Sequence, residues 1–590
     1  MLSSSTSQPL ISFGIFEVNL KTGELRKGGA KVRLQGQPFQ ILALLLERPG
    51  EVVTREEIRL TLWPADTFVD FEHGLNRAIN KLRDALADSA ENPRFIETLP
   101  RRGYRLLVPT SAGSTHAVPA EDARPQGIAT SLAILPLINA GATPDLDYLC
   151  DGIAETLIYS VAQLPSMRVM ARSTSFRYKG RDLDPQAIGR ELNVEVVLAG
   201  RVLQRGQQLA IQIELINVAD GSILWGDQYN RQTSDIFLVQ EEIAKTIFEK
   251  LRLNLSAEEL RRALKRHTSN TDAYHLYLRG RFHWNKRSAE GFHRGLEYFQ
   301  KAIEADPTYA LAYTGIADSY ALFGIFPYTL LAPSIAMTRC KAAAQRALEI
   351  DPLLAEAHTS LAMVSFFYDW DNRTEQYFRH AIELNPGYST AHQWYSIYLV
   401  ANGRFDEASV EVQRARQLDP LSPMAHSLVA VPYYFGRKPA DCVRMVRNAI
   451  ELEPEHAMLY IFLGMAAIQN DDLPTAIGGL SKACALSPDN ATALSRLGFA
   501  LALAGRTAEA KDILAKLETC SKLRYVSPID FMFVHLGLKR MDDFFHWMEK
   551  AYEERADFIV YFDVDPVLDA VRQDTRFLSI RDAKRRAAHQ

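Results

Sequence analysis

The spacing of apolar residues in the first hundred positions changes from that of strands to that of helices and back. Residues 11–20 and 31–34 alternate as strands do, with glycine-containing turns between them. Helical spacing follows in residues 38–47, 54–62 and 73–86, where Thr54 and Glu57 have the pattern of a capping box. The phrases FIETL and YRLLV then predict a hairpin around residues 100–103. Residues 11–108 are therefore predicted to form one small domain of strands, three helices and a hairpin.

The third predicted helix divides into an apolar and a polar face. Its apolar residues recur at i, i+4, i+7 and i+11 and should face the domain core: Leu75, Ile79, Leu82 and Leu86. The opposite face carries Asn76, Arg77, Asn80, Lys81 and Asp84. A helix fits the major groove of DNA, where Asn can pair with adenine and Arg with guanine, while Lys suits a phosphate or a guanine edge. The polar face is therefore a candidate DNA-reading surface.

Positive charge is concentrated around this helix and the hairpin. Residues 73–105 contain seven Lys or Arg and four acids. Arg101 and Arg102 lie at the predicted tip of the hairpin, where Gly103 permits a positive φ. A basic helix next to a basic hairpin favours a polyanion-binding surface, and the alternative is a solvated helix face beside an ordinary turn. Tyr104 and Trp63 are predicted to pack in the core rather than to stack on bases.

Two further segments separate this domain from the rest of the chain. Residues 109–128 are rich in small residues and proline, which predicts a flexible linker. Residues 129–255 alternate strand and helix patterns, and we predict a compact α/β module there. The side chains of Arg172, Ser173, Arg177 and Lys179 follow a strand end in this module. They could bind an anion, or they could belong to a solvated loop.

A proline recurs every 34 residues in the C-terminal half, each time after an amphipathic helix: Pro352, Pro386, Pro420, Pro454 and Pro488. This period resembles the tetratricopeptide family, in which helix pairs bury their apolar faces only by stacking on neighbouring pairs. The resemblance implies an all-α solenoid over residues 271–522. Residues 523–590 are then expected to form a degenerate helical cap.

The tetratricopeptide resemblance also implies which residues face the concave groove. They include Met363, Phe366, Ile397, Val400, Val431, Tyr434, Met465 and Ile468. Because these residues are apolar, we expect the groove to hold an apolar helix or strand of a partner protein. The alternative is that the protein's own flanking segments fill it.

Three histidines, His358, His392 and His426, also recur every 34 residues. Zinc needs its nitrogen ligands at about 2 Å, whereas stacked helices lie about 8–10 Å apart. We therefore predict packing roles for these histidines and no metal site.

Composition limits the class of protein further. A chain of 590 residues is too long for one core, and its net charge of -4 confines any polyanion-binding surface to a local patch. Five scattered cysteines without a CxxC pair favour a reducing, intracellular setting. No apolar run approaches the roughly 20 residues of a membrane span, and the N-terminus lacks the pattern of a secretion signal. These features predict a cytoplasmic protein without a membrane segment.

Motifs of the common enzyme classes were sought in the sequence and are absent. It contains no GxxxxGK[ST] loop, no HExxH, no GxSxG elbow and no CxxC pair. We therefore predict no catalytic residues, no cofactor and no metal.

Three separated phrases carry a family resemblance in the first domain: VVTREEIRLTLWP, LNRAINKLRDAL and FIETLPRRGYRLL. Together they resemble the winged helix-turn-helix effector domain of response regulators (OmpR/PhoB type) and of membrane-bound activators such as the cadaverine and toxin regulators. The resemblance implies that Asn76, Arg77, Asn80 and Lys81 enter the major groove and that Arg101 and Arg102 lie on a wing near the minor groove. It also suggests that two copies bind tandem half-sites on double-stranded DNA.

The phrases AILPL, IGRELNVEVVLAGRV and DGSILWGDQYN resemble the TolB-like module found beside tetratricopeptide arrays in bacterial regulators and some adenylate cyclases. That resemblance implies an interaction or structural domain.

The sequence thus predicts a multidomain α+β protein. It has an N-terminal winged helix, a central α/β module and a C-terminal all-α tetratricopeptide solenoid. The predicted function is a DNA-binding transcriptional regulator whose module and solenoid receive a signal or bind a partner protein. The alternative is a non-catalytic signalling scaffold in which the winged helix mediates protein contacts.

Overall fold

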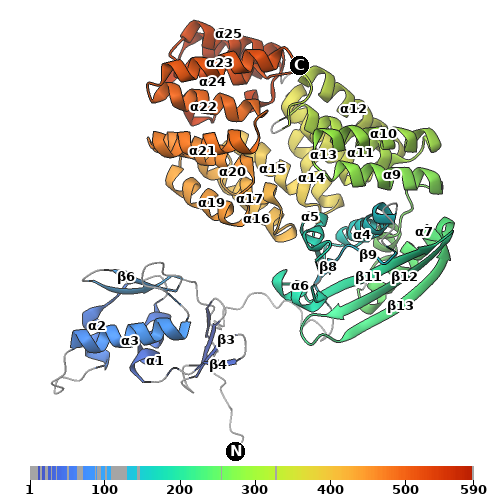
Figure 1. Cartoon of the computed structure of the whole chain (residues 1–590), viewed down its shortest axis with the longest axis horizontal. Coiled ribbons are helices and arrows are strands. Elements are labelled where there is room, and N and C mark those ends of the chain that lie inside the picture. The colour runs from blue at the N-terminus through green and yellow to red at the C-terminus, as the bar shows by residue number, and fades with distance from the viewer. Residues whose placement is uncertain are drawn as a thin grey trace, which may run out of the picture. The chain divides into compact units, whose positions relative to one another are not determined.

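The computed structural model divides the chain into two compact units, Met1–Arg124 and Pro125–Gln590 (Figure 1). It describes residues 11–13, 16–19, 24–27, 30–32, 34, 36–48, 52–62, 71–86, 88, 95–99, 102–107, 129–141, 146–181, 183–253, 255–325 and 328–587. Each unit has its own hydrophobic core.

The first unit begins with a four-stranded antiparallel sheet in the order β1-β2-β3-β4. Its strands are β1 (Ile11–Phe13), β2 (Phe16–Asn19), β3 (Glu24–Lys27) and β4 (Ala30–Val32). The pattern of residues 11–20 predicted a single strand there, and it gave no sign of β3. Leu25 is the only apolar residue of β3, so an alternating pattern could not reveal that strand.

Three helices and a second sheet complete this unit. The helices are α1 (Gln37–Glu47), α2 (Arg55–Leu62) and α3 (Phe71–Leu86). The sheet has the order β5-β7-β6, with β5 (Val52–Thr54), β6 (Ile96–Leu99) and β7 (Gly103–Leu106). The predicted capping box is present at the start of α2, where the Thr54 nitrogen donates to Glu57 at 2.7 Å and the Glu57 nitrogen donates back to Thr54 Oγ1 at 3.2 Å.

The second unit starts with an α/β module built on a mixed sheet in the order β10-β8-β11-β12-β13. Its strands are β8 (Ser131–Ile134), β9 (Ile138–Asn139), β10 (Arg168–Val169), β11 (Val196–Arg205), β12 (Gln208–Asn217) and β13 (Ile223–Gln232). Strand β8 runs parallel to β10 and β11, whereas β12 and β13 are antiparallel to their neighbours.

Helices cover both faces of this sheet. Alternate residues of β8 point to opposite sides, so Leu132 and Ile134 pack with α4 (Asp147–Ala162) and α7 (Ile236–Lys250). Ala133 and Leu135 instead join the cluster that contains α6 (Pro185–Glu191). A short helix, α5 (Arg172–Ser175), follows β10, and α8 (Ala257–Ala263) leads towards the repeats.

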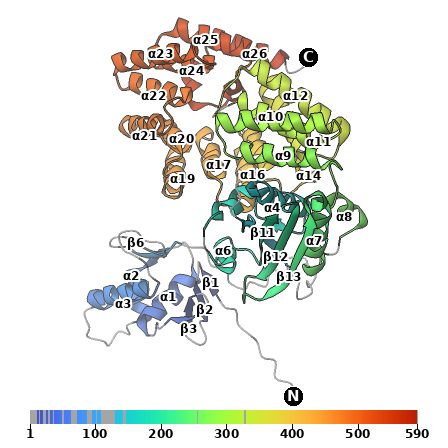
Figure 2. The same ribbon diagram turned by 45° about the vertical axis from the view of Figure 1, so that its right-hand side comes forward.

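The remainder is a solenoid of antiparallel helix pairs (Figures 1 and 2). The first pairs are α9 (Thr271–Trp284) with α10 (Ala289–Ala305), α11 (Ala310–Phe323) with α12 (Pro333–Ile350), α13 (Ala355–Val364) with α14 (Thr374–Leu384), and α15 (Ser389–Ala401) with α16 (Phe405–Leu418). The next repeat has a divided first helix, α17 (Pro423–Leu428) and α18 (Val431–Phe435), which packs against α19 (Pro439–Leu452).

Three more pairs close the solenoid: α20 (Ala457–Gln469) with α21 (Leu473–Leu486), α22 (Ala491–Leu503) with α23 (Thr507–Ser521), and α24 (Pro528–Gly537) with α25 (Met541–Glu553). Two 3₁₀ segments, Asp557–Tyr561 and Pro566–Val571, and helix α26 (Thr575–Ala587) end the described chain. The predicted cap thus contains a further full helix pair. Among the helices described here, none is both long and apolar enough to cross a bilayer.

Within the second unit, α4 of the module packs against α9 of the first repeat. Figure 2 shows these two helices side by side. The Arg281 side chain on α9 donates to Glu155 Oε1 on α4 at 2.7 Å, and Arg172 Nε donates to the other oxygen of Glu155 at 2.8 Å. The pKa of Glu155 lies below its ordinary value, because these two guanidinium groups outweigh the cost of its burial.

Candidate nucleic-acid interface

Helix α3 has the two faces that its sequence predicts. Leu75, Ile79, Leu82 and Leu86 are at most 1% exposed and belong to the core of the first unit. The side chains on the other face are exposed: Asn76, Arg77, Asn80 and Lys81. The side chain of Asp84 lies outside the described residues. One surface of α3 therefore presents two amides and two cations to solvent.

A buried tyrosine on β7 forms a hydrogen bond to one residue of this surface. Tyr104 is 2% exposed, as its predicted core role requires, and its hydroxyl donates to Asn76 Oδ1 at 3.4 Å. Arg55, at the start of α2, donates from Nη2 to the same hydroxyl at 3.2 Å. The side-chain oxygen of Asn76 thus accepts a hydrogen bond within the domain, and its NH₂ group remains as the donor for a ligand. Trp63 lies outside the described residues.

One arginine of α3 is structural rather than free for a ligand. Arg83 is buried, and its Nη2 donates to the Ile96 carbonyl at 2.9 Å and to Thr98 Oγ1 at 2.7 Å. The carboxylate of Asp88, just beyond the helix, accepts from the Ile96 nitrogen at 2.8 Å. These contacts join α3 to β6, so the angle between the helix and the hairpin is set by buried hydrogen bonds.

The hairpin presents Arg102 to solvent at its turn. Arg101 lies outside the described residues. Gly103 does not have the positive φ expected of it; its backbone is extended in β7, and a Cβ there would lie 2.1 Å from the Val53 carbonyl oxygen. The glycine is needed because β5 approaches β7 closely. Arg105, counted with the basic residues above, forms an ion pair with Glu97 at 2.5 Å across the hairpin.

The protein's own C-terminal segment, residues 557–571, lies against part of the predicted partner groove of the solenoid. Seven of its eight residues are at most 9% exposed: Met363, Phe366, Ile397, Val400, Val431, Tyr434 and Met465. The eighth, Ile468, is half-buried. They share one hydrophobic cluster with Ile559, Phe562 and Leu568 of the C-terminal segment. The protein's own flanking segment thus covers part of the predicted groove, as in the alternative, and binding of a partner there stays a prediction.

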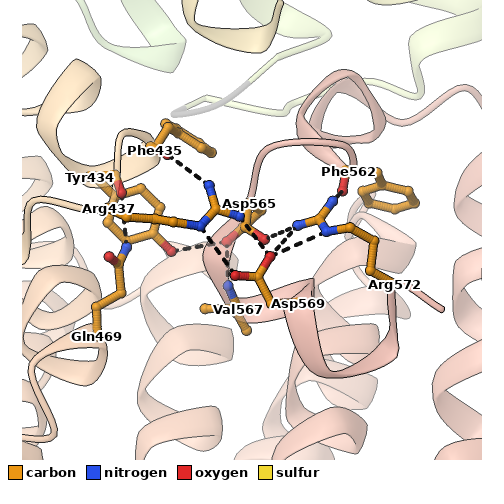
Figure 3. Close-up of polar contacts among 9 residues, drawn as sticks. All are labelled: Tyr434, Phe435, Arg437, Gln469, Phe562, Asp565, Val567, Asp569 and Arg572. Carbon is orange, nitrogen blue, oxygen red and sulfur yellow. Dashed lines mark hydrogen bonds and ion pairs between the residues drawn. The ribbon is translucent and has the colours of Figure 1, made fainter. Parts of the chain in front are cut away.

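Polar contacts attach this C-terminal segment to α18 (Figure 3). The Tyr434 hydroxyl donates to Asp565 Oδ1 at 3.1 Å, and Asp565 is fully buried. Arg437 Nη2 and Arg572 Nη2 both contact Asp569 Oδ1, at 2.7 and 2.6 Å. Gln469 Nε2 adds a bond to the Tyr434 carbonyl at 3.1 Å.

Each of the predicted side chains in the basic loop after β10 contacts a carboxylate, although Ser173, Arg177 and Lys179 are also exposed to solvent. The loop is therefore partly solvated, as in the alternative, and its cations are already paired. Arg172 pairs with Glu155, and Lys179 Nζ lies 2.6 Å from Asp151 Oδ1. Ser173 donates to Asp419, and Arg177 pairs with Glu453, both in the solenoid. The loop is thus an internal docking surface between the module and the repeats.

The repeating histidines contact prolines. Nε2 of His358 donates to the Pro352 carbonyl at 2.9 Å, and Nε2 of His392 donates to the Pro386 carbonyl at 3.2 Å. The pKa of His426 lies below its ordinary value because of burial, which outweighs its bond to the Pro420 backbone. Throughout the described part of the chain, no group of three or more His, Cys, Asp or Glu could hold a metal ion.

Three protein families match successive parts of the chain. Residues 29–106 match the family described as "Transcriptional regulatory protein, C terminal". Residues 128–246 match "HilA/YgeH-like transcriptional regulator, second domain", in the segment whose phrases resemble TolB-like modules. Residues 372–431 match the tetratricopeptide repeat.

Individual relatives match different shares of the chain. The transcriptional regulator HilA of Salmonella typhimurium is 24% identical over 452 residues, which are 75% of this chain and 76% of HilA. A putative adenylate cyclase 3 of Rhizobium meliloti is 30% identical over 246 residues, and the chain spans only 41% of that relative. The cholera toxin homolog transcriptional activator of Vibrio parahaemolyticus is 40% identical over 82 residues, 14% of this chain and 28% of the activator. The chain therefore has the architecture of a winged helix-turn-helix transcriptional regulator of the OmpR/PhoB type, joined to a HilA-like second domain and tetratricopeptide repeats.

Proposed function

We propose that the chain regulates transcription by reading duplex DNA with α3. One observation carries the proposal: the helix buries its whole apolar stripe and exposes Asn76, Arg77, Asn80 and Lys81. Amide and guanidinium groups on one helix face are suited to base edges in the major groove. Arg102, exposed at the hairpin turn, is assigned to the DNA backbone or the minor groove, and the same role is proposed for Arg101.

The availability of this surface supports the assignment. Within the described residues, Arg77, Asn80 and Lys81 take part in no ion pair or side-chain hydrogen bond. Arg83 and Arg105, by contrast, are occupied by contacts within the domain. The cations left on α3 can therefore displace counterions from DNA without breaking a contact of the fold.

The test compares two substitutions in the full chain on a site located by genome-wide footprinting and on random duplex DNA. Lys81→Ala should weaken binding to both and lower the slope of log K against log salt by about one, because one phosphate contact is lost. Asn80→Ala should weaken binding to the chosen site by about 1–3 kcal/mol and leave random DNA nearly unchanged. Lys482→Ala removes an exposed lysine of α21 and serves as the matched control.

Two outcomes would contradict the proposed DNA-binding role of α3. Equal losses of both variants on both DNAs would contradict the separate roles of Asn80 and Lys81. No duplex binding by the full chain at low salt would favour the alternative, a scaffold whose winged helix contacts proteins.

The module and the solenoid are proposed to receive the signal or the partner protein. A partner that entered the part of the groove covered by the C-terminal segment would displace that segment, and with it the contact between Tyr434 and Asp565. Binding of two copies to tandem half-sites is proposed as well. Sedimentation of the protein with a single DNA site would test it, since a 2:1 complex is expected.

A further inference from the structure

The concave side of the solenoid contains an apolar chamber of about 110 Å³ that is partly open to solvent. Its walls come from several repeats and from the C-terminal segment, and they include Trp394, Ile397, Val431, Ile461, Met465 and Phe558. Three of the predicted groove residues, Ile397, Val431 and Met465, therefore line this chamber. The volume is comparable to the about 150 Å³ of an engineered apolar cavity that takes up benzene.

One cation is buried at the wall of this chamber. Arg496 on α22 is 2% exposed, and its guanidinium carbon lies 3.5 Å from the ring centre of Phe533 and 4.9 Å from that of Phe558. Its Nε and Nη1 atoms are buried and have no hydrogen-bond partner among the described residues. Leaving a buried donor of a charged group unpaired is costly, so such a group in a functional protein calls for an acceptor.

Three acids lie near Arg496, and none of them accepts from Nε or Nη1: Asp530 and Asp557, which line the chamber, and Asp565. Burial raises the pKa of Asp530 to about 7 and raises the pKa of Asp565, although the charge of Arg496 acts on both in the opposite direction. Each of these two carboxyl groups therefore holds its proton far more readily than usual. When these carboxyl groups are protonated, an incoming anion can supply the negative charge next to Arg496.

A second, polar cavity of about 180 Å³ adjoins the chamber. Thr329, Thr492, Ser527 and Asp530 line both spaces. The polar cavity is lined in addition by Asn490, Arg524 and Tyr525. A charged ligand could therefore pass through it to reach the chamber.

We propose that this chamber is a binding site for a small organic monocarboxylate with one aromatic ring or a short hydrocarbon chain. The hydrocarbon part fills the apolar space between α15, α18 and α20, and the carboxylate pairs with the Arg496 guanidinium. Because Nε and Nη1 are covered in the ligand-free chain, the guanidinium turns towards the chamber on binding. A phosphate dianion fits less well, because one guanidinium beside Asp530 cannot balance two charges in an apolar space.

The experiment uses the full-length protein without DNA, so its result is independent of the proposed regulatory function. The probes are 4-fluorobenzoate and its neutral counterpart 4-fluorobenzyl alcohol, followed by ¹⁹F NMR and titration calorimetry. We expect saturable binding of the benzoate at least about tenfold tighter than that of the alcohol, since hydrogen bonds to a charged group contribute about 1.5–3 kcal/mol.

Two variants test the site directly. Arg496→Gln should weaken 4-fluorobenzoate binding roughly tenfold or more and leave the alcohol unaffected. Met465→Trp should fill the chamber and abolish binding of both probes, whereas the surface control Lys482→Ala should bind both as the natural chain does. Circular dichroism first establishes that each variant is folded.

Three results would overturn the proposal: no saturable benzoate binding, equal affinity of the two probes, or unchanged benzoate affinity in Arg496→Gln. If neither variant folds, the preference of the natural chain for the benzoate over the alcohol decides the matter.

Discussion

Thr174 Oγ1 donates a hydrogen bond to Asp419 Oδ1 at 2.7 Å, although the two residues are 245 positions apart in the sequence. The Leu421 nitrogen donates to the same hydroxyl at 2.9 Å, and the Ala171 nitrogen donates to the Leu418 carbonyl at 2.8 Å. Helix α5 of the module is thereby attached to the turn between α16 and α17 of the solenoid. The module and the repeats consequently share one buried polar interface, beside the contact of α4 with α9.

Thr174→Val should destabilise the second unit. The substitution keeps the shape of the side chain but removes one of the hydrogen bonds to Asp419, which is 4% exposed, and leaves the Leu421 nitrogen without its acceptor. An unpaired buried donor costs about 1–3 kcal/mol. Urea unfolding of the full chain measures the loss. Thr519→Val is the matched control, because Thr519 bonds only to the exposed carbonyl of Ala515 within its own helix. Equal midpoints for the two variants would show that the contact with Asp419 does not stabilise the docking.

Glu155→Gln should loosen the interface between α4 and α9. The glutamate bridges Arg172 and Arg281, and its loss leaves two largely covered cations without their shared anion. The side chain of Glu155 is 19% exposed, so we expect a loss of about 1.5–3 kcal/mol rather than the full cost of breaking a buried pair. Differential scanning calorimetry would measure the change in Tm. Glu290→Gln breaks the exposed pair with Arg294 and should have almost no effect.

Tyr434→Phe should open the C-terminal segment locally. The hydroxyl is lost, and Asp565, whose Oδ2 atom already lacks a partner within the described residues, keeps only its bond from the Val567 nitrogen. Faster amide hydrogen exchange is expected in residues 557–571, measured by mass spectrometry. Tyr313→Phe, which removes an exposed bond to the Pro307 carbonyl, provides the comparison. Unchanged exchange in residues 557–571 would mean that apolar packing alone holds the segment.

Binding of 4-fluorobenzoate should tighten as the pH falls from 8 to 6. Asp530 titrates with a pKa of about 7, and Asp557 adds negative charge near it while Arg496 and Arg524 oppose this. Below that pKa Asp530 is neutral, so it no longer repels the bound carboxylate; above it the repulsion returns. Asp530→Asn should bind the probe at pH 8 as tightly as the natural chain does at pH 6. An affinity of the natural chain that is constant over this range would contradict the prediction.

The titration of Asp530 also makes the free energy of unfolding depend on pH. A folded-state pKa of about 7, above the ordinary value of 3.8, means that folding favours the protonated form of Asp530. The stabilisation is fully present below the unfolded pKa and is lost as the pH rises through about 7. Asp530→Asn should therefore raise Tm relative to the natural chain more at pH 8 than at pH 5. A difference in Tm that does not change with pH would contradict this assignment.

Helices and strands with a regular spacing of apolar residues could be predicted from the sequence, whereas strands with few buried residues could not. The stripe from Leu75 to Leu86 identified the buried face of α3, because helical spacing fixes which residues share a face. Strand β13 escaped prediction, since Tyr229 is its one buried residue and its hydrogen bonds come from pairing with β12. Strand β5 has only three residues, and it is likewise defined by its pairing with a neighbouring strand, β7.

The sequence alone was enough to predict a strand and helix domain, an α/β module and a helical repeat, because periodic spacing is a local property, and the resemblance of three phrases identified the first domain as a winged helix. The proline period even located the turns whose carbonyls His358 and His392 contact. Only the tertiary structure decided that residues 172–179 dock on the solenoid, that residues 557–571 lie against the concave groove, and that Arg496 lies at the wall of an apolar chamber. Those relations join residues far apart in the chain, and their partners are chosen by burial and charge in three dimensions.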